Sequence, residues 1–123
     1  MKRARLLLID DEREVRESMR RLLALRHDVT GVGTVDEALA LLADQSFDVV
    51  LCDLVMPGRS GIHFVDEVAA RWPERCPSVA LMTGAIIEPE RVELFSALGV
   101  TLLQKPVSLA ELDRVIGLAT ASG

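Results

Sequence analysis

Five polar residues are spread along the chain in a combination that could carry out phosphoryl chemistry. They are three carboxylates, one hydroxyl and one ammonium, at Asp10, Asp11, Asp53, Thr83 and Lys105. In one pocket, the carboxylates would repel one another and leave a net negative charge that a divalent cation would neutralise. Because all the ligands would be oxygens, a hard ion such as Mg²⁺ fits. A carboxylate beside Mg²⁺ and a lysine can attack phosphorus and form an acyl phosphate.

These residues stand at the ends of segments that we predict to be β-strands. Asp53 ends an apolar run, and the Pro- and Gly-rich stretch from Leu54 to Gly61 that follows it is typical of a loop. An apolar run without alternation indicates a strand that is covered on both faces. The predicted strands are residues 4–9, 29–32, 47–52, 78–82 and 100–104.

Helical segments alternate with these strands. Apolar residues at helical spacing predict helices over residues 12–25 and 62–71. Three more helices are predicted from their end signals, which are capping boxes at Thr34 with Glu37 and at Ser108 with Glu111, and a first-turn Pro89 with a C-terminal Gly99.

This alternation predicts an α/β fold in a single domain over residues 1–123. We expect a flavodoxin-like, doubly wound (βα)5 sandwich with a five-stranded parallel sheet of order 2-1-3-4-5. Ligands of such folds bind at the carboxyl ends of the strands, where the strand order reverses. The fold would therefore bring the five polar residues to one edge of the sheet.

The bulk composition excludes several classes of protein. Half of the residues are hydrophobic, yet no apolar run reaches membrane-spanning length and no signal-peptide pattern opens the chain. Cys52 and Cys76 are not a CxxC pair, so we expect a reducing cytoplasm, with Cys52 as a small core residue. The net charge of −5 argues against general nucleic-acid binding.

Positive charge is concentrated near the start of the chain. Residues 1–27 hold eight Lys or Arg and five Asp or Glu. Two interpretations remain open, a solvated helix surface and a docking face for an acidic partner.

Four short stretches match one known family in their residues, order and spacing. They are Asp10-Asp11, the D-x-x-M-P-x-x-x-G pattern from Asp53 to Gly61, Thr83-Gly84-Ala85 and Lys105-Pro106. Across essentially the whole chain, the sequence resembles the receiver domain of bacterial two-component response regulators, of the CheY-like superfamily. The resemblance implies that Asp53 accepts a phosphoryl group from a histidine kinase or phosphotransfer protein. It also implies no catalysis beyond the domain's own phosphorylation and dephosphorylation.

The resemblance further assigns roles by position. Mg²⁺, or Mn²⁺ as a substitute, would be bound by Asp11, Asp53 and the backbone carbonyl of Val55, with Asp10 acting through a metal-bound water. Lys105 would pair with Asp53 and then with the phosphate, and would precede a cis peptide bond to Pro106. Thr83 would move to hydrogen-bond a phosphate oxygen.

The same resemblance implies how the signal is received and passed on. The phosphodonor would touch the first helix around Arg13 and Arg16. The output surface, which could also form a homodimer, would comprise the helix around residues 89–98, the strand 100–104 and the helix after Ser108. Arg91, Glu93 and Leu102 are candidates on or near that surface.

Two departures from the family pattern are visible. Leu102 occupies a position where the family usually has Tyr or Phe, which puts the usual coupling to output in question. Val55 and Ala85 are small and apolar at positions that influence phosphate lifetime in the family, which predicts slow self-hydrolysis.

Other functions were also considered for this sequence. A haloacid-dehalogenase phosphatase needs an acid where Val55 stands, and Gly31-Val32-Gly33 is too short for a dinucleotide-binding motif. A degenerate receiver that binds partners without phosphorylation remains an alternative, as do a stand-alone regulator and a part of a larger protein. His27 and His63 are interpreted as surface or boundary residues.

Overall fold

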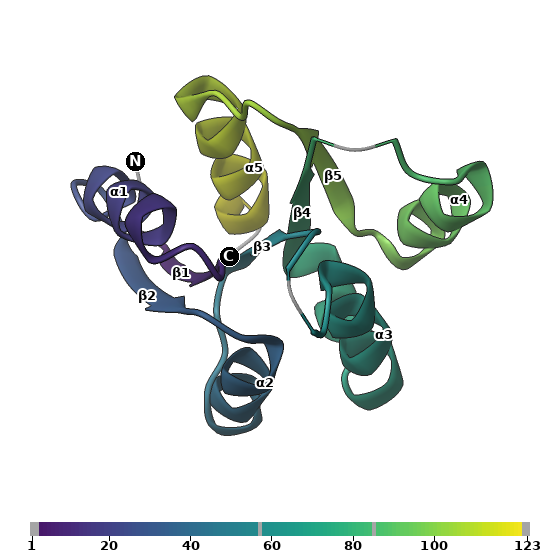
Figure 1. Ribbon diagram of the computed structural model, residues 1–123. Helices are drawn as coiled ribbons and strands as arrows, with labels where there is room; N and C mark the ends of the chain where they lie inside the picture. The colour runs from purple at the N-terminus through teal and green to yellow at the C-terminus, as the bar shows by residue number, and fades with distance from the viewer. Residues whose placement is uncertain (1–2, 57, 85, 122–123) are drawn as a thin grey trace.

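A computed structural model describes residues 3–56, 58–84 and 86–121, and it forms a parallel five-stranded sheet flanked by helices (Figure 1). The strand order is β2-β1-β3-β4-β5, so the predicted doubly wound fold is confirmed. The elements are β1 (Arg5–Ile9), α1 (Arg13–Leu23), β2 (Asp28–Val32), α2 (Val35–Asp44), β3 (Val49–Asp53), α3 (Gly61–Arg71), η1 (Pro73–Ser78), β4 (Val79–Thr83), α4 (Pro89–Leu98), β5 (Thr101–Gln104) and α5 (Leu109–Ala121).

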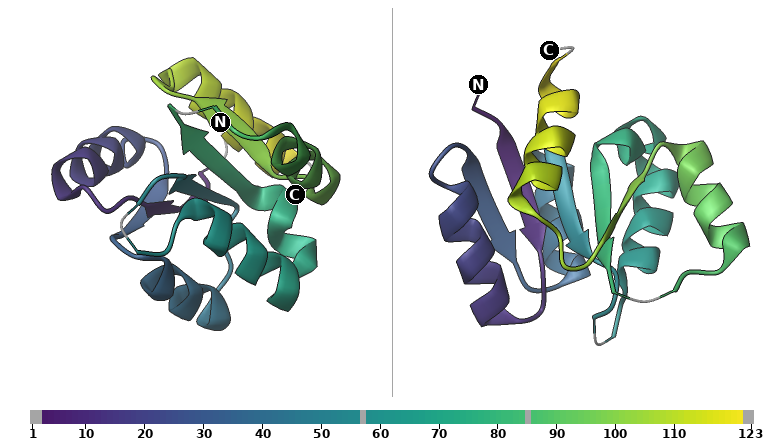
Figure 2. Two further views of the ribbon diagram at one scale, coloured as in Figure 1. Left: turned by 45° about the vertical axis from the view of Figure 1, so that its right-hand side comes forward. Right: turned by 90° about the horizontal axis from the view of Figure 1, so that it is seen from above.

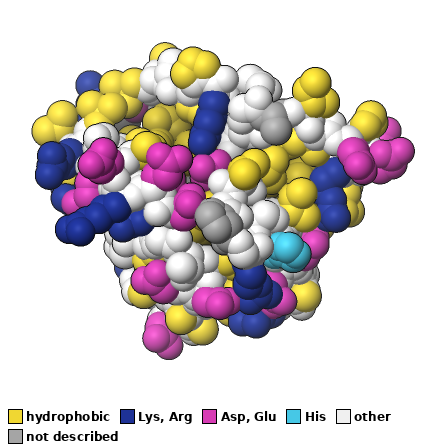
Figure 3. Space-filling view, viewed as in Figure 1, with side chains coloured by type: hydrophobic (Ala, Val, Ile, Leu, Met, Phe, Trp, Pro, Cys, Tyr) yellow, Lys and Arg dark blue, Asp and Glu magenta, His cyan; other side chains and the backbone are white. Residues whose placement is uncertain are grey.

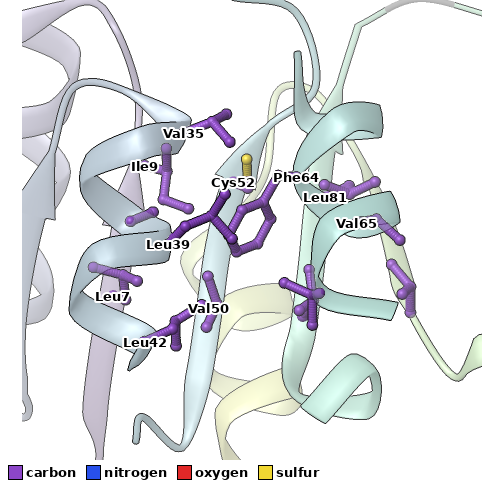
Figure 4. Packing of buried hydrophobic residues seen from close by; sticks show 14 of the residues in the cluster. Leu7, Ile9, Val35, Leu39, Leu42, Val50, Cys52, Phe64, Val65 and Leu81 are labelled. Carbon is purple, nitrogen blue, oxygen red and sulfur yellow. The ribbon is translucent and has the colours of Figure 1, made fainter. Parts of the chain in front are cut away.

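Two hydrophobic cores hold the helices against the two faces of the sheet. Helices α2, α3 and α4 cover one face, while α1 and α5 cover the other (Figure 1). On the first face, Phe64 of α3 points toward Leu39 of α2, close to Cys52 of β3 (Figure 4). Every residue of β3 and β4 is buried, which explains why the β3 sequence is apolar without alternation.

Local capping interactions fix where several helices begin. Thr34 accepts a hydrogen bond from the Glu37 amide at 3.1 Å, and Ser108 does the same for Glu111 at 3.1 Å, as the two predicted capping boxes require. A third box, which the sequence did not reveal, begins α3. Its Ser60 amide donates to Nδ1 of His63 at 3.1 Å, so a histidine takes the place usually held by Glu or Gln.

The prediction for His27 was wrong. Its ring is buried, and Nδ1 accepts a hydrogen bond from the backbone amide of Ala4 at 3.1 Å. His27 therefore joins the turn after α1 to the start of β1, and it is a core residue and not a boundary residue.

The 3-10 helix η1 was also absent from the predicted elements. It follows Trp72, whose ring lies beneath the guanidinium groups of Arg71 and Arg75, at 5.9 and 5.0 Å from the ring centre. Arg75 also donates to the Leu42 carbonyl at 2.6 Å, which ties this end of α3 to α2.

The strand register places the carboxyl ends of all strands at one edge of the sheet (Figure 2). Ile9 pairs with Cys52, Asp53 with Met82, and Thr83 with Gln104. Asp10, Asp53, Thr83 and Lys105 therefore come together although they are far apart in the sequence. Among the described residues, no helix is both long enough and apolar enough to span a bilayer.

Candidate functional site

An ion pair between two strand ends lies at the centre of this edge. The Lys105 Nζ atom is 3.0 Å from Oδ1 of Asp53, and the Val55 amide lies 3.4 Å from the same oxygen. Asp53 is buried, whereas the Lys105 side chain is partly exposed. The aspartate is thus a buried carboxylate with a cationic partner that can still be reached from solvent.

Lys105 is held in place by the neighbouring strand. Its backbone amide donates to the Thr83 carbonyl at 2.8 Å, which continues the pairing of β4 with β5 by one residue. The peptide bond between Lys105 and Pro106 is cis, as predicted.

Three carboxylates form the acidic part of the site. One oxygen from each of Asp10, Asp11 and Asp53 lies within 4.8 Å of the other two. Asp10 and Asp53 are buried, while Asp11 is exposed. Acidic side chains gather at the middle of this face of the molecule, with a Lys or Arg side chain beside them (Figure 3). The set fits a hard cation such as Mg²⁺, because its donors are carboxylate oxygens close enough to share one ion.

The pKa of Asp10 reflects its burial and this crowding. Burial raises the pKa of Asp10 above its ordinary value, and the charges of Asp53 and Asp11 add to that increase. The Glu12 amide, which donates to Asp10 Oδ1 at 2.9 Å, and the Lys105 ammonium both oppose it. A cation bound here would remove the mutual repulsion that disfavours the ionised carboxylates.

Gly61 is the last residue of the loop after Asp53, and the structure explains why a glycine stands there. A Cβ atom on Gly61 would lie 2.9 Å from both the Asp53 carbonyl oxygen and the Leu54 Cα. Its amide donates to the Leu54 carbonyl at 2.9 Å. The first turn of α3 therefore packs directly on the backbone that carries Asp53, and only glycine fits there without displacement.

Thr83 and Leu102 border the site on the α4 side. Thr83 is buried, and a hollow of about 320 Å³ is lined by Thr83, Ile86, Ile87, Val92, Leu102, Leu103 and Gln104. Leu102 is half-buried and packs against the core below α4. The predicted movement of Thr83 and the loop behind it would take place next to this hollow.

The two arginines expected to meet a phosphodonor differ in their surroundings. Arg13 is exposed. Arg16 is half-buried, and its Nη1 donates to the carbonyl oxygen of Asp10 at 2.7 Å. This contact was not predicted from the sequence. Two features of the sequence could have indicated it: Arg16 lies one turn into the helix after Asp10-Asp11, and Gly31 and Gly33 leave space near it.

The lifetime prediction rests partly on a residue that is not described. Val55 is exposed beside Asp53, whereas Ala85 lies outside the described residues, as does Pro57 of the D-x-x-M-P pattern. The prediction of slow self-hydrolysis therefore stays a prediction.

Comparison with known proteins agrees with this geometry. Residues 6–117 match the family described as the response regulator receiver domain. The chain belongs to this family. As a receiver domain it is part of two-component signal transduction, and the match disfavours the phosphatase, the dinucleotide-binding fold and a phosphorylation-independent module.

Named relatives of this receiver domain are regulators. It is 31% identical over 120 residues to the response regulator protein PilR of Pseudomonas aeruginosa, covering 97% of this chain and 26% of that protein. It is 45% identical over 73 residues to the hydrogenase transcriptional regulatory protein HoxA of Cupriavidus necator, covering 59% of this chain and 15% of that protein. The chain thus spans about a quarter or less of the length of these two curated relatives.

The fold of the receiver domain has solved counterparts. A crystal structure of a response regulator receiver domain protein from Clostridium thermocellum superposes with a TM-score of 0.84 at 28% identity. That alignment covers 97% of this chain and 95% of the other. The fold is therefore shared, over nearly the whole chain, with a receiver domain protein of known structure.

Proposed function

We propose that this receiver domain accepts a phosphoryl group on Asp53 from a histidine kinase or a phosphotransfer protein. The observation that carries the proposal is the 3.0 Å contact between Lys105 Nζ and Asp53 Oδ1, at the edge where Asp10 and Asp11 converge. A buried carboxylate can attack phosphorus, and a solvent-accessible ammonium beside it can then stabilise the charged phosphoryl group.

In the proposed reaction, a carboxylate oxygen of Asp53 attacks the phosphorus of a phosphohistidine. The new O–P bond forms as the P–N bond breaks, and the electron pair of that bond stays on the imidazole nitrogen. Lys105 is placed to stabilise negative charge on the transferring oxygens, and the Thr83 hydroxyl is proposed to hydrogen-bond one of them.

Asp11, Asp53 and the Val55 carbonyl are the proposed direct ligands of Mg²⁺ or Mn²⁺, with Asp10 acting through water. When bound, the ion supplies positive charge that offsets the carboxylates and the phosphoryl oxygens. Asp53 ends β3 and Asp10 directly follows β1, so the two strands position these carboxylates.

The response is proposed to run through Thr83, the loop behind it and α4. The α4–β5–α5 face is the proposed output and homodimer surface. Glu93 is exposed on it, whereas Arg91 pairs with Asp66 of α3 at 3.1 Å and lies over the Phe95 ring. Glu93 is thus better placed for output than Arg91, while half-buried Leu102 lies below this surface, and exposed Arg13 is the better placed donor contact on α1.

Further features of the proposal concern the chain as a whole. We propose that residues 1–123 act as one receiver domain in the cytoplasm, where its buried free cysteines stay reduced. It is proposed to catalyse only its own phosphorylation and dephosphorylation, without binding nucleic acid or membrane through this domain.

The proposal is tested by incubating the protein with acetyl phosphate and Mg²⁺ and measuring its intact mass. The wild type should gain one phosphoryl group, while Asp53→Asn should gain none. Asp44→Asn, which changes an exposed aspartate at the end of α2, is the matched control and should behave as wild type. Absence of a mass gain on the wild type, or an undiminished gain on Asp53→Asn, would contradict the proposal.

A further inference from the structure

The Arg16 side chain passes close to the backbone of two glycines. A Cβ atom on Gly31 would lie 3.2 Å from Cγ and 3.3 Å from Cδ of Arg16. A Cβ atom on Gly33 would lie 3.0 Å from its Nη1. Any larger residue at either position would push against the arginine, because these separations are shorter than ordinary van der Waals contact. The Gly31-Val32-Gly33 sequence thus makes room for one side chain of α1.

The arginine reaches the backbone of the acidic site. Its Nη1 donates to the Asp10 carbonyl at 2.7 Å, and this carbonyl belongs to the peptide group that joins Asp10 to Asp11. The Asp10 amide donates to the Val32 carbonyl at 3.1 Å, and its Oδ1 accepts from the Glu12 amide at 2.9 Å. Amide, carbonyl and carboxylate of Asp10 are therefore each fixed by a hydrogen bond.

We propose that Arg16 is a positioning residue for the ion site. By fixing the Asp10–Asp11 peptide plane, it sets the direction in which the Asp11 backbone leaves β1, and so the placement of the Asp11 carboxylate. The proposal rests on the proposed function, in which Asp11 binds Mg²⁺ directly. A hydrogen bond from a charged guanidinium is stronger than one between neutral groups, which suits Arg16 to fix the peptide group that precedes the exposed Asp11.

This role differs from simple docking of a phosphodonor. An arginine whose guanidinium is engaged with the Asp10 carbonyl affects the site before any partner arrives. Its removal should weaken binding of Mg²⁺ to the unphosphorylated protein, which involves neither a donor nor phosphoryl transfer.

The experiment measures Mg²⁺ affinity of the unphosphorylated protein by calorimetry, with the Asp11 amide followed by NMR. Arg16→Met keeps the apolar stem and removes the donors, and Gly33→Ala displaces Nη1 while keeping the arginine. Arg16→Met should weaken Mg²⁺ binding roughly tenfold, the size of effect typical for residues that orient metal ligands. Gly33→Ala should weaken it in the same direction but less, because its Cβ meets the flexible end of the arginine. Arg16→Lys should recover part of the affinity, and Arg21→Met, on an exposed arginine of the same helix, should bind as wild type.

The double variant separates positioning from general damage. If Gly33→Ala acts through Arg16, Arg16→Met with Gly33→Ala should bind Mg²⁺ no more weakly than Arg16→Met alone. Wild-type Mg²⁺ affinity in Arg16→Met would overturn the proposal, as would fully additive losses or a loss matched by Arg21→Met. Failure of the proposed function would appear separately, as a wild type that gains no phosphoryl group on Asp53.

Unfolding in urea provides the structural check. We expect Arg16→Met to keep a cooperative transition under conditions where its Mg²⁺ affinity is reduced. A loss of affinity that disappears when the folded fractions of the variants are matched would overturn the positioning role and leave Arg16 as a stabilising residue only.

Discussion

The backbone of Gly61 lies so close to that of Asp53 that a Cβ atom on Gly61 would be 2.9 Å from the Asp53 carbonyl oxygen. This contact joins the end of β3 to the first residue of α3. Helix α3 therefore packs against the backbone of the proposed phospho-acceptor, and this close packing requires glycine as its first residue. The closeness of this approach makes it the first feature to test.

We expect Gly61→Ala to destabilise the protein by about 1–3 kcal/mol, the usual cost of adding an atom to a packed site. Gly117→Ala is the matched control, because nothing lies within 4 Å of a Cβ atom there. That control should gain roughly 0.5–1 kcal/mol from the better helix propensity of alanine in α5. Urea unfolding measures both, and equal behaviour of the two variants would show that the contact is not restrictive.

Lys105→Met should have opposite effects on two properties of the site. Removing the ammonium beside Asp53 leaves the carboxylates less compensated, so Mg²⁺ should bind more tightly. Phosphorylation by acetyl phosphate should fall by about a hundredfold or more, because charge on the transferring oxygens loses its partner. Calorimetry and intact mass against time measure the two quantities. A parallel fall in both would instead indicate that Lys105 is needed to build the site.

His27 should make the stability of the protein depend on pH. Burial lowers the pKa of His27 below its ordinary value, and the charges of Arg3 and Arg26 add to this, while Asp113 and Asp28 oppose it. The proton of the neutral ring sits on Nε2, which is buried without a hydrogen-bond partner among the described residues, because Nδ1 accepts from the Ala4 amide. A second proton on Nδ1 would face that amide.

The sign of the dependence follows from linkage. A histidine with a depressed folded-state pKa stabilises the fold fully above its unfolded value of about 6.5, and this stability is lost as the pH falls below that value toward the folded pKa. Unfolding free energies from about pH 7.5 to pH 5 should fall more steeply for wild type than for His27→Gln. Parallel curves, or a ring that titrates above about 6.5 by NMR, would contradict this account.

Leu102→Phe should strengthen the link between the site and α4. The hollow of about 320 Å³ that Leu102 shares with Thr83 has room for a ring, and a ring would fill it differently when Thr83 moves. We expect the change in hydrogen exchange of α4 on phosphorylation to be larger in Leu102→Phe than in wild type. Leu102→Met, which keeps the volume nearly constant, serves as the control. An unchanged α4 response would show that an aromatic residue is not needed here.

The fold was predictable because its signals are local and repeated. The β3 run ending at Asp53 gave both a buried strand and a strand-end carboxylate, and the same logic placed Thr83 and Lys105 beside it. Once the strands are parallel, the meeting of these residues follows from topology and needs no knowledge of side-chain packing.

Other features depend on contacts that no local pattern announces. His27 lies in a short turn where no periodicity indicates burial, and its partner is the Ala4 amide of another segment. The Ser60 cap uses a histidine, which does not match the capping-box pattern. Arg16 reaches Asp10 past Gly31 of β2 and Gly33 just after it, so the contact depends on residues of a neighbouring segment.

The position of Trp72 determines what intrinsic fluorescence can report for this protein. The chain has one tryptophan and no tyrosine. Trp72 follows the last residue of α3, an 11-residue helix about 16 Å long whose first residue packs on Asp53. Emission from the Trp72 indole should therefore follow melting of the α3–η1 end, while a paramagnetic ion such as Mn²⁺ held by the carboxylates would lie beyond contact quenching. The single tryptophan thus provides a probe of unfolding at the α3–η1 end that is optically separate from the ion site.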